Sequence, residues 1–204
     1  MQKKQHWERV YTTKSTEQVS WFQEHARRSL ALIQKTGVSH SASIIDVGGG
    51  ASTLAKDLIL HGYSTITVLD LSAKALSEAK QHMGPHAASV EWLEADITTA
   101  ILPTHHYDLW HDRAVFHFLT TQNQREAYIK NVRHSVKPGG HVIVATFAKD
   151  GPEKCSGLPV TRYNADELHA EFGDQFGLIH HEEEAHHTPS GSVQAFVYCY
   201  CRLV

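Results

Sequence analysis

The order of apolar and polar segments predicts an α/β fold, built on a mostly parallel sheet with helices on both faces. Short apolar runs typical of buried strands alternate with segments of helical periodicity along the 204 residues. Three consecutive glycines follow the first of these runs, and Asp70 ends the second. A chain of this length is sufficient for one well-buried domain and too short for two ordinary ones.

The first strand-like run, 44–47, leads directly into Gly48, Gly49 and Gly50. Glycine lets the backbone turn sharply, and the missing side chain lets the backbone approach a ligand closely. Helical periodicity then begins at Thr53. Because the free N–H groups at the start of a helix suit polar or anionic ligands, we expect a ligand-binding loop here.

The second strand-like run, 66–69, ends in Asp70. A carboxylate in this position can accept hydrogen bonds from both hydroxyls of a ribose. A glycine loop alone is a weak signal, whereas the order strand, loop, helix, strand, acid is more specific. This order predicts a nucleotide-like cofactor.

The other expected elements continue the alternation of strands and helices. The patterns predict helices over 17–35, 72–84, 121–136 and 164–172, and strands over 88–94, 107–110, 141–147, 175–184 and 192–202. The segment before residue 17 is aromatic and polar and too short to hold a core of its own, so we expect an arm that lies across the domain or frays.

Composition excludes several classes of protein. The net charge of −3 comes from 19 basic and 22 acidic residues, without the basic stripe of a nucleic-acid binder. No apolar stretch approaches the ~20 residues of a membrane span, and the opening residues lack the apolar core of a secretory signal. Three cysteines without a C-x-x-C pair argue against a disulfide scaffold or a structural zinc site. We therefore expect a cytoplasmic protein without nucleic-acid or membrane partners.

Seventeen histidines, including three adjacent pairs, suggest a metal site at first sight. Neighbouring residues point to opposite faces of a strand and diverge on a helix, so a pair seldom supplies two ligands to one ion. The pairs 105–106, 180–181 and 186–187 show no recognised ligand spacing. We expect solvated or helix-end histidines and no metal.

Ligands of parallel α/β sheets bind beyond the carboxyl ends of the strands. The first four strand ends carry the glycine loop, Asp70, Asp96 and the run 110–113, which reads WHDR. Acids after the second and third strands favour a ligand with hydroxyl and amino donors and leave no attractive place for a pyrophosphate. This pattern argues against a nicotinamide cofactor.

These residues resemble the class I S-adenosylmethionine-dependent methyltransferases over roughly residues 40–150. Asp46, Gly48 and Gly50 match the glycine-rich motif of that family, with Ser52 in place of its third glycine. The segments YDLWHDR and KPGGHVIVATF correspond to its fourth-strand motif and to its turn and fifth strand. The resemblance implies a Rossmann-like sheet of seven strands with the last strand antiparallel.

The resemblance also implies S-adenosylmethionine as the cofactor. Asp70 would hold its ribose hydroxyls, Asp96 its adenine amino group, and Ile97 would pack on the adenine ring. The expected cofactor-binding residues are Asp46, Gly48, Gly49, Gly50, Asp70, Leu71, Asp96, Ile97 and His111.

Methyl transfer from a sulfonium is an in-line displacement in which positioning supplies much of the rate. If the acceptor must lose a proton, His111, Asp112 and His117 are the candidate bases, whereas a thiol needs none. Arg113 is a further catalytic candidate that can hold a carboxylate of the acceptor. The alternative is structural: Asp112 and Arg113 form a local ion pair, and His117 is packed in the core.

The segments HWERVY and VSWFQ resemble the start of a small single-domain branch of the superfamily that includes protein lysine, tellurite and thiopurine methyltransferases. The resemblance implies a lid over residues 1–40 and a methyltransferase domain over 41–204. Trp7, Tyr11 and Trp21 are candidate lid contacts, unless the arm only packs. Cys155, in a loop rich in glycine and proline, is expected to line the acceptor pocket, unless that loop is an ordinary surface connection.

The leading hypothesis is a methyltransferase that uses S-adenosylmethionine and acts on a small molecule. A protein lysine methyltransferase of the same fold and a cofactor-binding protein without turnover are the alternatives. A nicotinamide oxidoreductase is disfavoured by Asp96 and by the lack of an obvious hydride-transfer set. The sequence leaves open the acceptor, its reacting atom, the need for a base and the oligomeric state.

Overall fold

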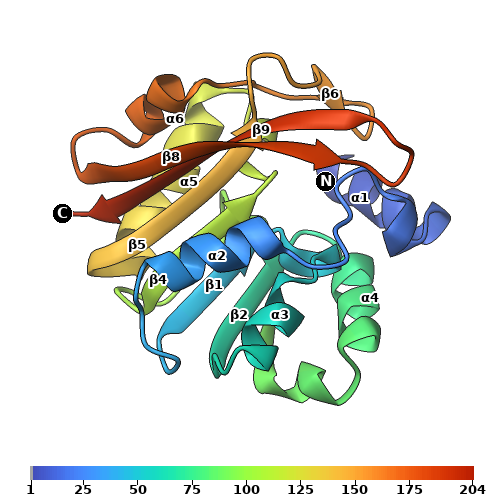
Figure 1. Cartoon of the computed structure of the whole chain (residues 1–204), viewed down its shortest axis with the longest axis horizontal. Coiled ribbons are helices and arrows are strands. Elements are labelled where there is room, and N and C mark those ends of the chain that lie inside the picture. Colours follow the sequence, from blue (N-terminus) through green and yellow to red (C-terminus); the bar gives the residue numbers. More distant parts are fainter. Residues whose placement is uncertain (1) are drawn as a thin grey trace.

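A seven-stranded sheet forms the centre of the computed structural model, which describes residues 2–204 (Figure 1). The strands lie in the order β3-β2-β1-β4-β5-β9-β8. β9 is antiparallel to both of its neighbours, and the other pairings are parallel. The predicted fold class is confirmed. The strand bounds are β1 Ser43–Val47, β2 Thr65–Asp70, β3 Val90–Glu94, β4 Tyr107–Arg113, β5 Val136–Phe147, β8 Phe176–His187 and β9 Val193–Leu203.

Helices cover both faces of this sheet, as predicted (Figure 1). α2, α3 and α4 lie on one face, and α5 and α6 on the other. β6 and β7 form a small separate hairpin. The bounds are α1 Gln2–Thr13, α2 Arg27–Lys35, α3 Leu54–Leu60, α4 Ala73–Met83, α5 Gln122–Ser135, α6 Ala165–Phe172, β6 Lys154–Cys155 and β7 Leu158–Pro159.

The alternation of side chains along the strands creates a separate core on each face. Ile44 packs in a cluster with Leu54 and Leu58 of α3, while the adjacent Ile45 packs in a cluster with Tyr128 of α5. Burying each such side chain contributes about 1.5–3 kcal/mol to stability. The two cores hold the sheet rigidly between the helix layers.

The parallel register brings the carboxyl ends of four strands to one edge of the sheet. Val47 of β1 is paired with Leu69 of β2 and with Asp112 of β4, and Asp70 is paired with Glu94. The turns that follow these strands therefore open at the same edge, where the sequence places the ligand.

The predicted helix over 17–35 is wrong in its first half. Only α2 is α-helical, and a short 3-10 turn over Thr16–Gln18 leads into irregular chain before it. The buried Asp57 of α3 accepts a hydrogen bond from the Ala26 N–H at 2.8 Å, and its other oxygen lies 2.9 Å from the His25 Nδ1. These contacts fix the start of α2, and Val19 and Ala26 are buried although they do not share a helix face.

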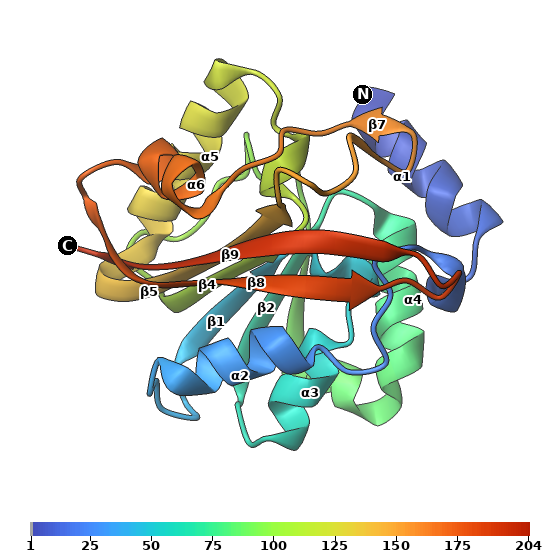
Figure 2. The same ribbon diagram turned by 45° about the horizontal axis from the view of Figure 1, so that its top comes forward.

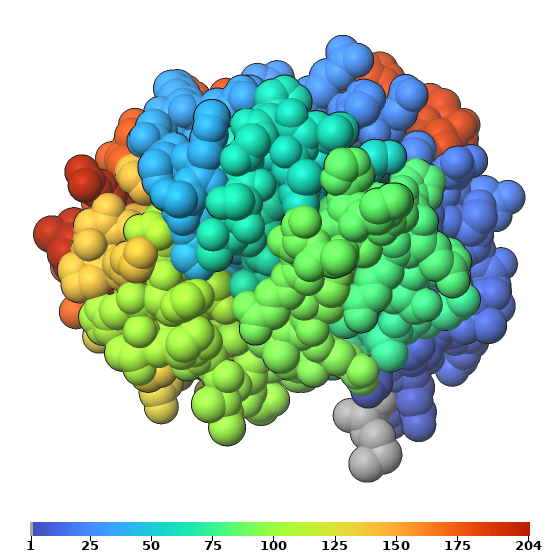
Figure 3. Space-filling model, turned by 90° about the horizontal axis from the view of Figure 1, so that it is seen from below, coloured from blue at the N-terminus to red at the C-terminus, as the bar shows by residue number. Residues whose placement is uncertain are grey.

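The segment that was expected to be an arm forms the helix α1. Residue 1 of the expected lid, 1–40, lies outside the described residues. The Glu8 carboxylate accepts hydrogen bonds from the N–H groups of Ala73 and Lys74, at 2.7 and 3.3 Å, at the start of α4. The Lys3 Nζ donates to the Phe118 carbonyl at 3.0 Å. Figure 2 shows α1 beside β7, and Figure 3 shows the blue N-terminal segment against the green chain of α4.

Several strand boundaries differ from the prediction. β3 begins at Val90 because the preceding residues, Gly84–Ser89, form a 3-10 turn. β4 continues to Arg113, three residues beyond the predicted end, because its pairing with β5 extends that far. His111 and Asp112 therefore belong to a central strand and not to a loop.

The cysteines and histidines within residues 2–204 are arranged without a metal cluster. Cys199 and Cys201 are free, buried and on one side of β9, with their sulfur atoms 3.1 Å apart. His186 is buried and its ring lies 2.8 Å from the Ser20 carbonyl, so the prediction of a solvated side chain is wrong there. Residues 2–204 contain no group of three or more histidine, cysteine or acidic side chains that could hold a metal. In the same range, no helix combines the length and the apolar character that crossing a membrane requires.

Replacement of Asp57 by alanine is expected to lower the free energy of unfolding by about 1–3 kcal/mol, because it leaves the buried Ala26 N–H without a partner. Urea unfolding followed by circular dichroism measures the change. Asp174 is an exposed carboxylate and provides the control, since Asp174→Ala should change stability by less than about 0.5 kcal/mol. Equal effects of the two substitutions would contradict this role of Asp57.

Candidate functional site

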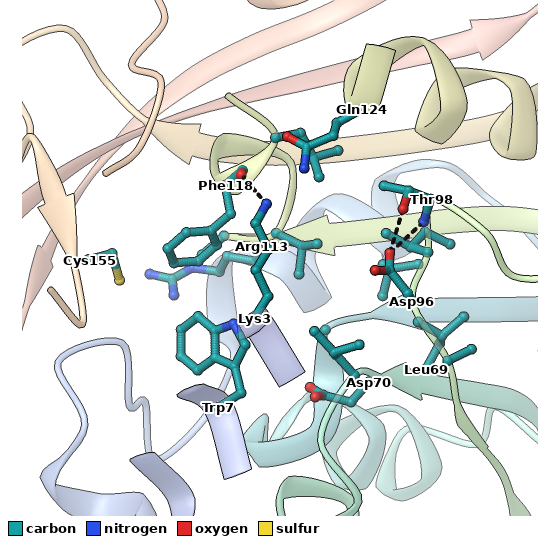
Figure 4. A pocket seen from close by; sticks show the side chains of 18 of the residues that line it. Lys3, Trp7, Leu69, Asp70, Asp96, Thr98, Arg113, Phe118, Gln124 and Cys155 are labelled. Carbon is teal, nitrogen blue, oxygen red and sulfur yellow. Dashed lines mark hydrogen bonds between the residues drawn. The ribbon is translucent and has the colours of Figure 1, made fainter. Parts of the chain in front are cut away.

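A cavity opens at the carboxyl edge of the sheet, between the strand ends and α1 (Figure 4). About 880 Å³ of space, part of it open to solvent, lies between its walls. The turns after β1, β2, β3 and β4 form one side, and α1, Trp21 and the β6–β7 hairpin form the other.

The glycine loop can be built only from glycine. Gly48 has a φ of +74°, and a Cβ there would collide with the side chain of Val115. A Cβ on Gly49 would collide with the Asp46 carboxylate, and one on Gly50 would lie 2.7 Å from the Asp70 Oδ2. The backbone therefore forms part of the floor of the site, as the sequence predicts.

Asp70 lies at the end of β2 with its carboxylate at the cavity wall. The carboxylate accepts hydrogen bonds from the Ser72 N–H at 2.8 Å and the Gly50 N–H at 3.1 Å. Burial raises the pKa of Asp70 to about 6, although these backbone hydrogen bonds act in the opposite direction. Asp70 is thus poised to change charge just below neutral pH.

The loop after β3 supplies a second carboxylate. Asp96 is exposed at the cavity wall, and its Oδ1 accepts hydrogen bonds from the N–H and the hydroxyl of Thr98, at 2.9 and 2.7 Å. Ile97 is buried, and both it and Leu71 line the same cavity. The structure thus brings together the residues expected at the ribose and adenine.

His111 does not line this larger cavity; it lies below the glycine loop in a smaller one that it shares with Asp46. Its Nδ1 lies 2.7 Å from the Asp46 Oδ1, and its Nε2 lies 2.9 Å from the Ser29 hydroxyl. All three side chains are buried, and the Asp46 Oδ2 has no hydrogen-bond partner within residues 2–204. The chain of contacts fixes Asp46 with one oxygen left free.

Asp112, an expected catalytic residue, lines neither of these cavities. Its carboxylate accepts hydrogen bonds from the N–H groups of Val115 and Phe116, at 2.8 and 3.1 Å, and from the Tyr128 hydroxyl at 2.7 Å. Complete burial raises its pKa to about 7. The geometry gives Asp112 a structural role: it holds the turn that carries Val115 to the glycine loop.

His117 is also away from the cavity. It is completely buried, and its Nδ1 accepts the Phe147 N–H at 3.3 Å. Burial, assisted by the positive charge of Arg113, lowers the pKa of His117 to about 3. The side chain is therefore a neutral core residue, which agrees with the structural alternative.

Arg113 does line the larger cavity, but its partners are not those expected of a local ion pair. Its Nε donates to the Tyr198 hydroxyl at 2.9 Å, and its Nη2 to the Glu184 Oε2 at 3.3 Å. The guanidinium lies 4.1 Å from the centre of the Phe196 ring. The alternative in which Arg113 pairs with Asp112 is wrong, because β8 and β9 supply the partners of the guanidinium.

Three aromatic residues from the N-terminal segment, Trp7, Tyr11 and Trp21, line the cavity. The Trp7 ring contacts those of Trp21 and Phe118 edge to face, with centroids 5.7 and 5.2 Å apart. Tyr11 is buried, and its ring lies 6.2 Å from that of Trp21. Such edge-to-face contacts are favourable and keep water from this side of the site.

Cys155 lines the cavity from the β6–β7 hairpin. Its thiol is buried, and this burial raises its pKa to about 12. The thiol is therefore neutral at physiological pH and presents an apolar, uncharged surface.

Sequence reasoning missed several residues of the site. Lys3 and Phe118 line the cavity. In these two parts of the chain, the sequence patterns indicate Trp7 and His117 instead. Glu184 and Tyr198 lie in the last two strands, and no local pattern connects them with Arg113. Their contribution depends on the antiparallel pairing of β8 and β9.

The fold and the site together define a class of protein that binds a nucleoside-containing ligand at the carboxyl edge of an α/β sheet. The model of a family described as a methyltransferase domain matches residues 44–140. A ubiquinone biosynthesis O-methyltransferase of Serratia proteamaculans is 25% identical over 120 residues, which cover 58% of this chain and 48% of the relative. The chain spans about half the length of the curated relatives it matches.

Solved structures extend the similarity to the whole fold. A structure described for the conversion of a disulfide bond into a thioacetal during echinomycin biosynthesis has a TM-score of 0.79 at 18% identity, covering 98% of this chain and 92% of that one. The N-methyltransferase NodS of Bradyrhizobium japonicum, in complex with S-adenosylhomocysteine, has a TM-score of 0.68 at 13% identity, covering 96% and 97%. Residues 44–140 thus match a methyltransferase domain, and the fold of the chain is that of the class I S-adenosylmethionine-dependent methyltransferase superfamily.

The residues at the site fit the cofactor of this superfamily, S-adenosylmethionine. Gly48 brings the backbone to the cavity wall without a side chain, and Asp70 offers a carboxylate there to hydroxyl donors. The free, buried Oδ2 of Asp46 requires a positively charged or hydrogen-bonding partner, which the amino group of an amino acid can supply. The donors and acceptors of the chain and of the cofactor are thus complementary.

Replacement of Asp112 by asparagine separates its structural role from a catalytic one. The amide has one acceptor oxygen and turns an NH₂ group toward donors, so we expect stability to fall by about 1–3 kcal/mol. Calorimetric titration should give an affinity for S-adenosylhomocysteine within about threefold of the unchanged protein, because Asp112 does not line the cavity. Unchanged stability with a large loss of affinity would contradict the structural role.

Proposed function

We propose that the chain is a methyltransferase that uses S-adenosylmethionine to methylate a small molecule in the cytoplasm. One observation carries the proposal: a single cavity joins Asp70 and Asp96 to a space between Trp7, Phe118 and Cys155. The first part suits a nucleoside, and the second leaves space for an acceptor. When bound, S-adenosylmethionine supplies a methyl group on a positively charged sulfur atom.

The cofactor roles follow from what each wall of the cavity offers. Asp70 accepts hydrogen bonds from the ribose hydroxyls, and Asp96 accepts from the adenine amino group, with Ile97 against the ring. Asp46, held by His111, receives the amino group of the amino-acid end. Gly48 and Leu71 line the cavity, and Gly49 and Gly50 let the loop pack closely against the carboxylates of Asp46 and Asp70.

On the acceptor side, positioning and exclusion of water are the main contributions of the chain. Trp7 and Phe118 present apolar rings to the cavity, and α1 is held over it by Lys3 and Glu8. The helix α1 thus acts as a lid on the cavity, whereas α2, also within the expected lid 1–40, packs in the core on one face of the sheet. Opening and closing of such a segment would admit the ligands.

The larger cavity has no histidine among the described residues that line it. The Cys155 thiol, whose pKa burial raises to about 12, is a poor base near neutral pH. We therefore propose an acceptor whose nucleophile is ionised without help near neutral pH, or an amine that loses its proton after the transfer. His111, Asp112 and His117 then support the site from below.

The charges in the cavity favour a small molecule over a protein lysine. Lys3 and Arg113 both line it, and two cations beside the acceptor space disfavour a lysine ammonium. Burial lowers the pKa of the Lys3 amine, while the nearby Asp96 carboxylate acts in the opposite direction. These are the observations that separate the two candidate acceptors.

The proposal is tested by binding and by transfer. Calorimetry should detect saturable binding of S-adenosylhomocysteine and none of NADH, and tight binding of NADH alone would exclude the proposal. Methyl-labelled S-adenosylmethionine is then incubated with a lysate, and proteins are separated from metabolites. We expect the label in the metabolite fraction; label in protein would identify a lysine-type acceptor, and unchanged cofactor would indicate binding without turnover.

The affinity for S-adenosylhomocysteine should depend on pH through Asp70. Its pKa of about 6 in the ligand-free protein means that the carboxylate, which accepts two hydroxyl hydrogen bonds, is lost as the pH falls through 6. Binding at pH 5 should therefore be about tenfold weaker than at pH 7.5. Asp70→Asn should bind weakly at both pH values, with this dependence abolished; a wild-type affinity constant from pH 5 to 7.5 would contradict the role of Asp70.

A further inference from the structure

The acceptor end of the cavity contains a guanidinium group with unused donors. Arg113 uses its Nε for the Tyr198 hydroxyl and its Nη2 for Glu184, and no described residue accepts a hydrogen bond from its Nη1. Although it has no partner, Nη1 is not shielded from solvent. The donors of Nη1 are therefore accessible, and Arg113 lines both the larger cavity and the smaller one that holds Asp46.

This guanidinium is held rigidly in place. Its side chain is 10% exposed, and it rests on the Phe196 ring at 4.1 Å while Tyr198 and Glu184 hold one edge. The Tyr198 hydroxyl also donates to the Glu184 Oε2 at 2.8 Å, so both partners of Arg113 are themselves fixed. An immobile donor loses little entropy when a ligand binds to it.

The direction of the side chain assigns it to the acceptor and not to the nucleoside. In Figure 4, the guanidinium points toward Cys155 and away from Asp70 and Asp96. Its partners belong to β8 and β9, on the opposite side of β4 from β2 and β3. The surrounding wall is apolar, with Trp7 and Phe118 beside it.

Resting on the proposed function, we propose that Arg113 determines the substrate class of this site: a small acceptor with an apolar body and a single carboxylate, which the open edge of the guanidinium binds. A planar carboxylate matches paired N–H donors in geometry and charge. Glu184 already offsets part of the positive charge, which favours a singly charged carboxylate over a phosphate. The carboxylate also fixes the end of the acceptor, so that its nucleophile faces the other end of the cavity.

The test compares two probes that differ only in charge and in the carboxylate. The affinities of 4-fluorobenzoate and 4-fluorobenzamide are measured by fluorine NMR titration with S-adenosylhomocysteine at saturation. We expect the unchanged protein to bind the benzoate at least about tenfold more tightly, and Arg113→Met to bind the two with similar affinity. Equal binding by the unchanged protein, or a preference that persists in Arg113→Met, would overturn the inference.

Lys3 provides the matched control, because it is the other basic residue in the wall of the same cavity. Its Nζ already donates to the Phe118 carbonyl, so Lys3→Met should keep the preference for the benzoate. Loss of the preference in Lys3→Met alone would assign it to Lys3 and overturn the role of Arg113. Arg113→Met leaves the buried Glu184 carboxylate without its positively charged partner, which can destabilise the protein. The double variant Arg113→Met/Glu184→Gln removes both charges, so it should fold and also show no preference for the benzoate.

A second pair of probes distinguishes the acceptor from the cofactor as the source of the carboxylate. 5′-Methylthioadenosine lacks the amino-acid end of S-adenosylhomocysteine. We expect Arg113→Met to change the calorimetric affinity for both by less than about threefold. A tenfold loss for S-adenosylhomocysteine alone would place its carboxylate on Arg113 and overturn the assignment to the acceptor. Failure of the unchanged protein to bind S-adenosylhomocysteine would contradict the proposed function, whereas binding without a benzoate preference would contradict only this inference.

Discussion

The parallel pairing of β1 with β2 and β4 is the constraint on which the site depends. Parallel strands end at the same edge, so three stretches of chain that are far apart in sequence open side by side. The glycine loop, Asp70 and Arg113 acquire their positions from this register, and a shift of one residue would turn each side chain to the opposite face. Burial of apolar side chains on both faces makes such a shift costly, since each core would lose its contacts.

Buried polar contacts then set the geometry within this frame. Asp46, His111 and Ser29 form one chain below the glycine loop, and Asp112 organises the turn after β4. Because these groups are shielded from water, a misplaced partner would leave a donor or carboxylate unsatisfied. They support the backbone of the glycine loop, while Asp70, Asp96 and Arg113 face the cavity itself.

Local patterns in the sequence were sufficient to predict the sheet, its flanking helices and the place of Asp70 and Asp96 at one edge of the sheet. Strand ends in a parallel sheet share an edge, so Asp70 and Asp96 could be placed together before any coordinates. The prediction of a helix over 17–35 was wrong in its first half. The apolar residues there are buried by irregular chain that the contact with Asp57 holds against the core, and not by one face of a helix. Asp112 and His117 were candidate catalytic residues because a sequence does not show how deeply a side chain is buried. Both lie away from the cavity because β4 extends to Arg113 and the turn after it packs in the core.

The sequence by itself determined the α/β architecture, the glycine loop and the acidic strand ends, because these depend on local periodicity and on the lack of a Cβ. The tertiary structure alone decided which charged groups reach the cavity. Arg113 is paired with Glu184, 71 positions away, and rests on Phe196, and these contacts exist only because β8 and β9 complete the sheet beside β5. Side chains so far apart in the chain meet through strand pairing and burial, which no local pattern records.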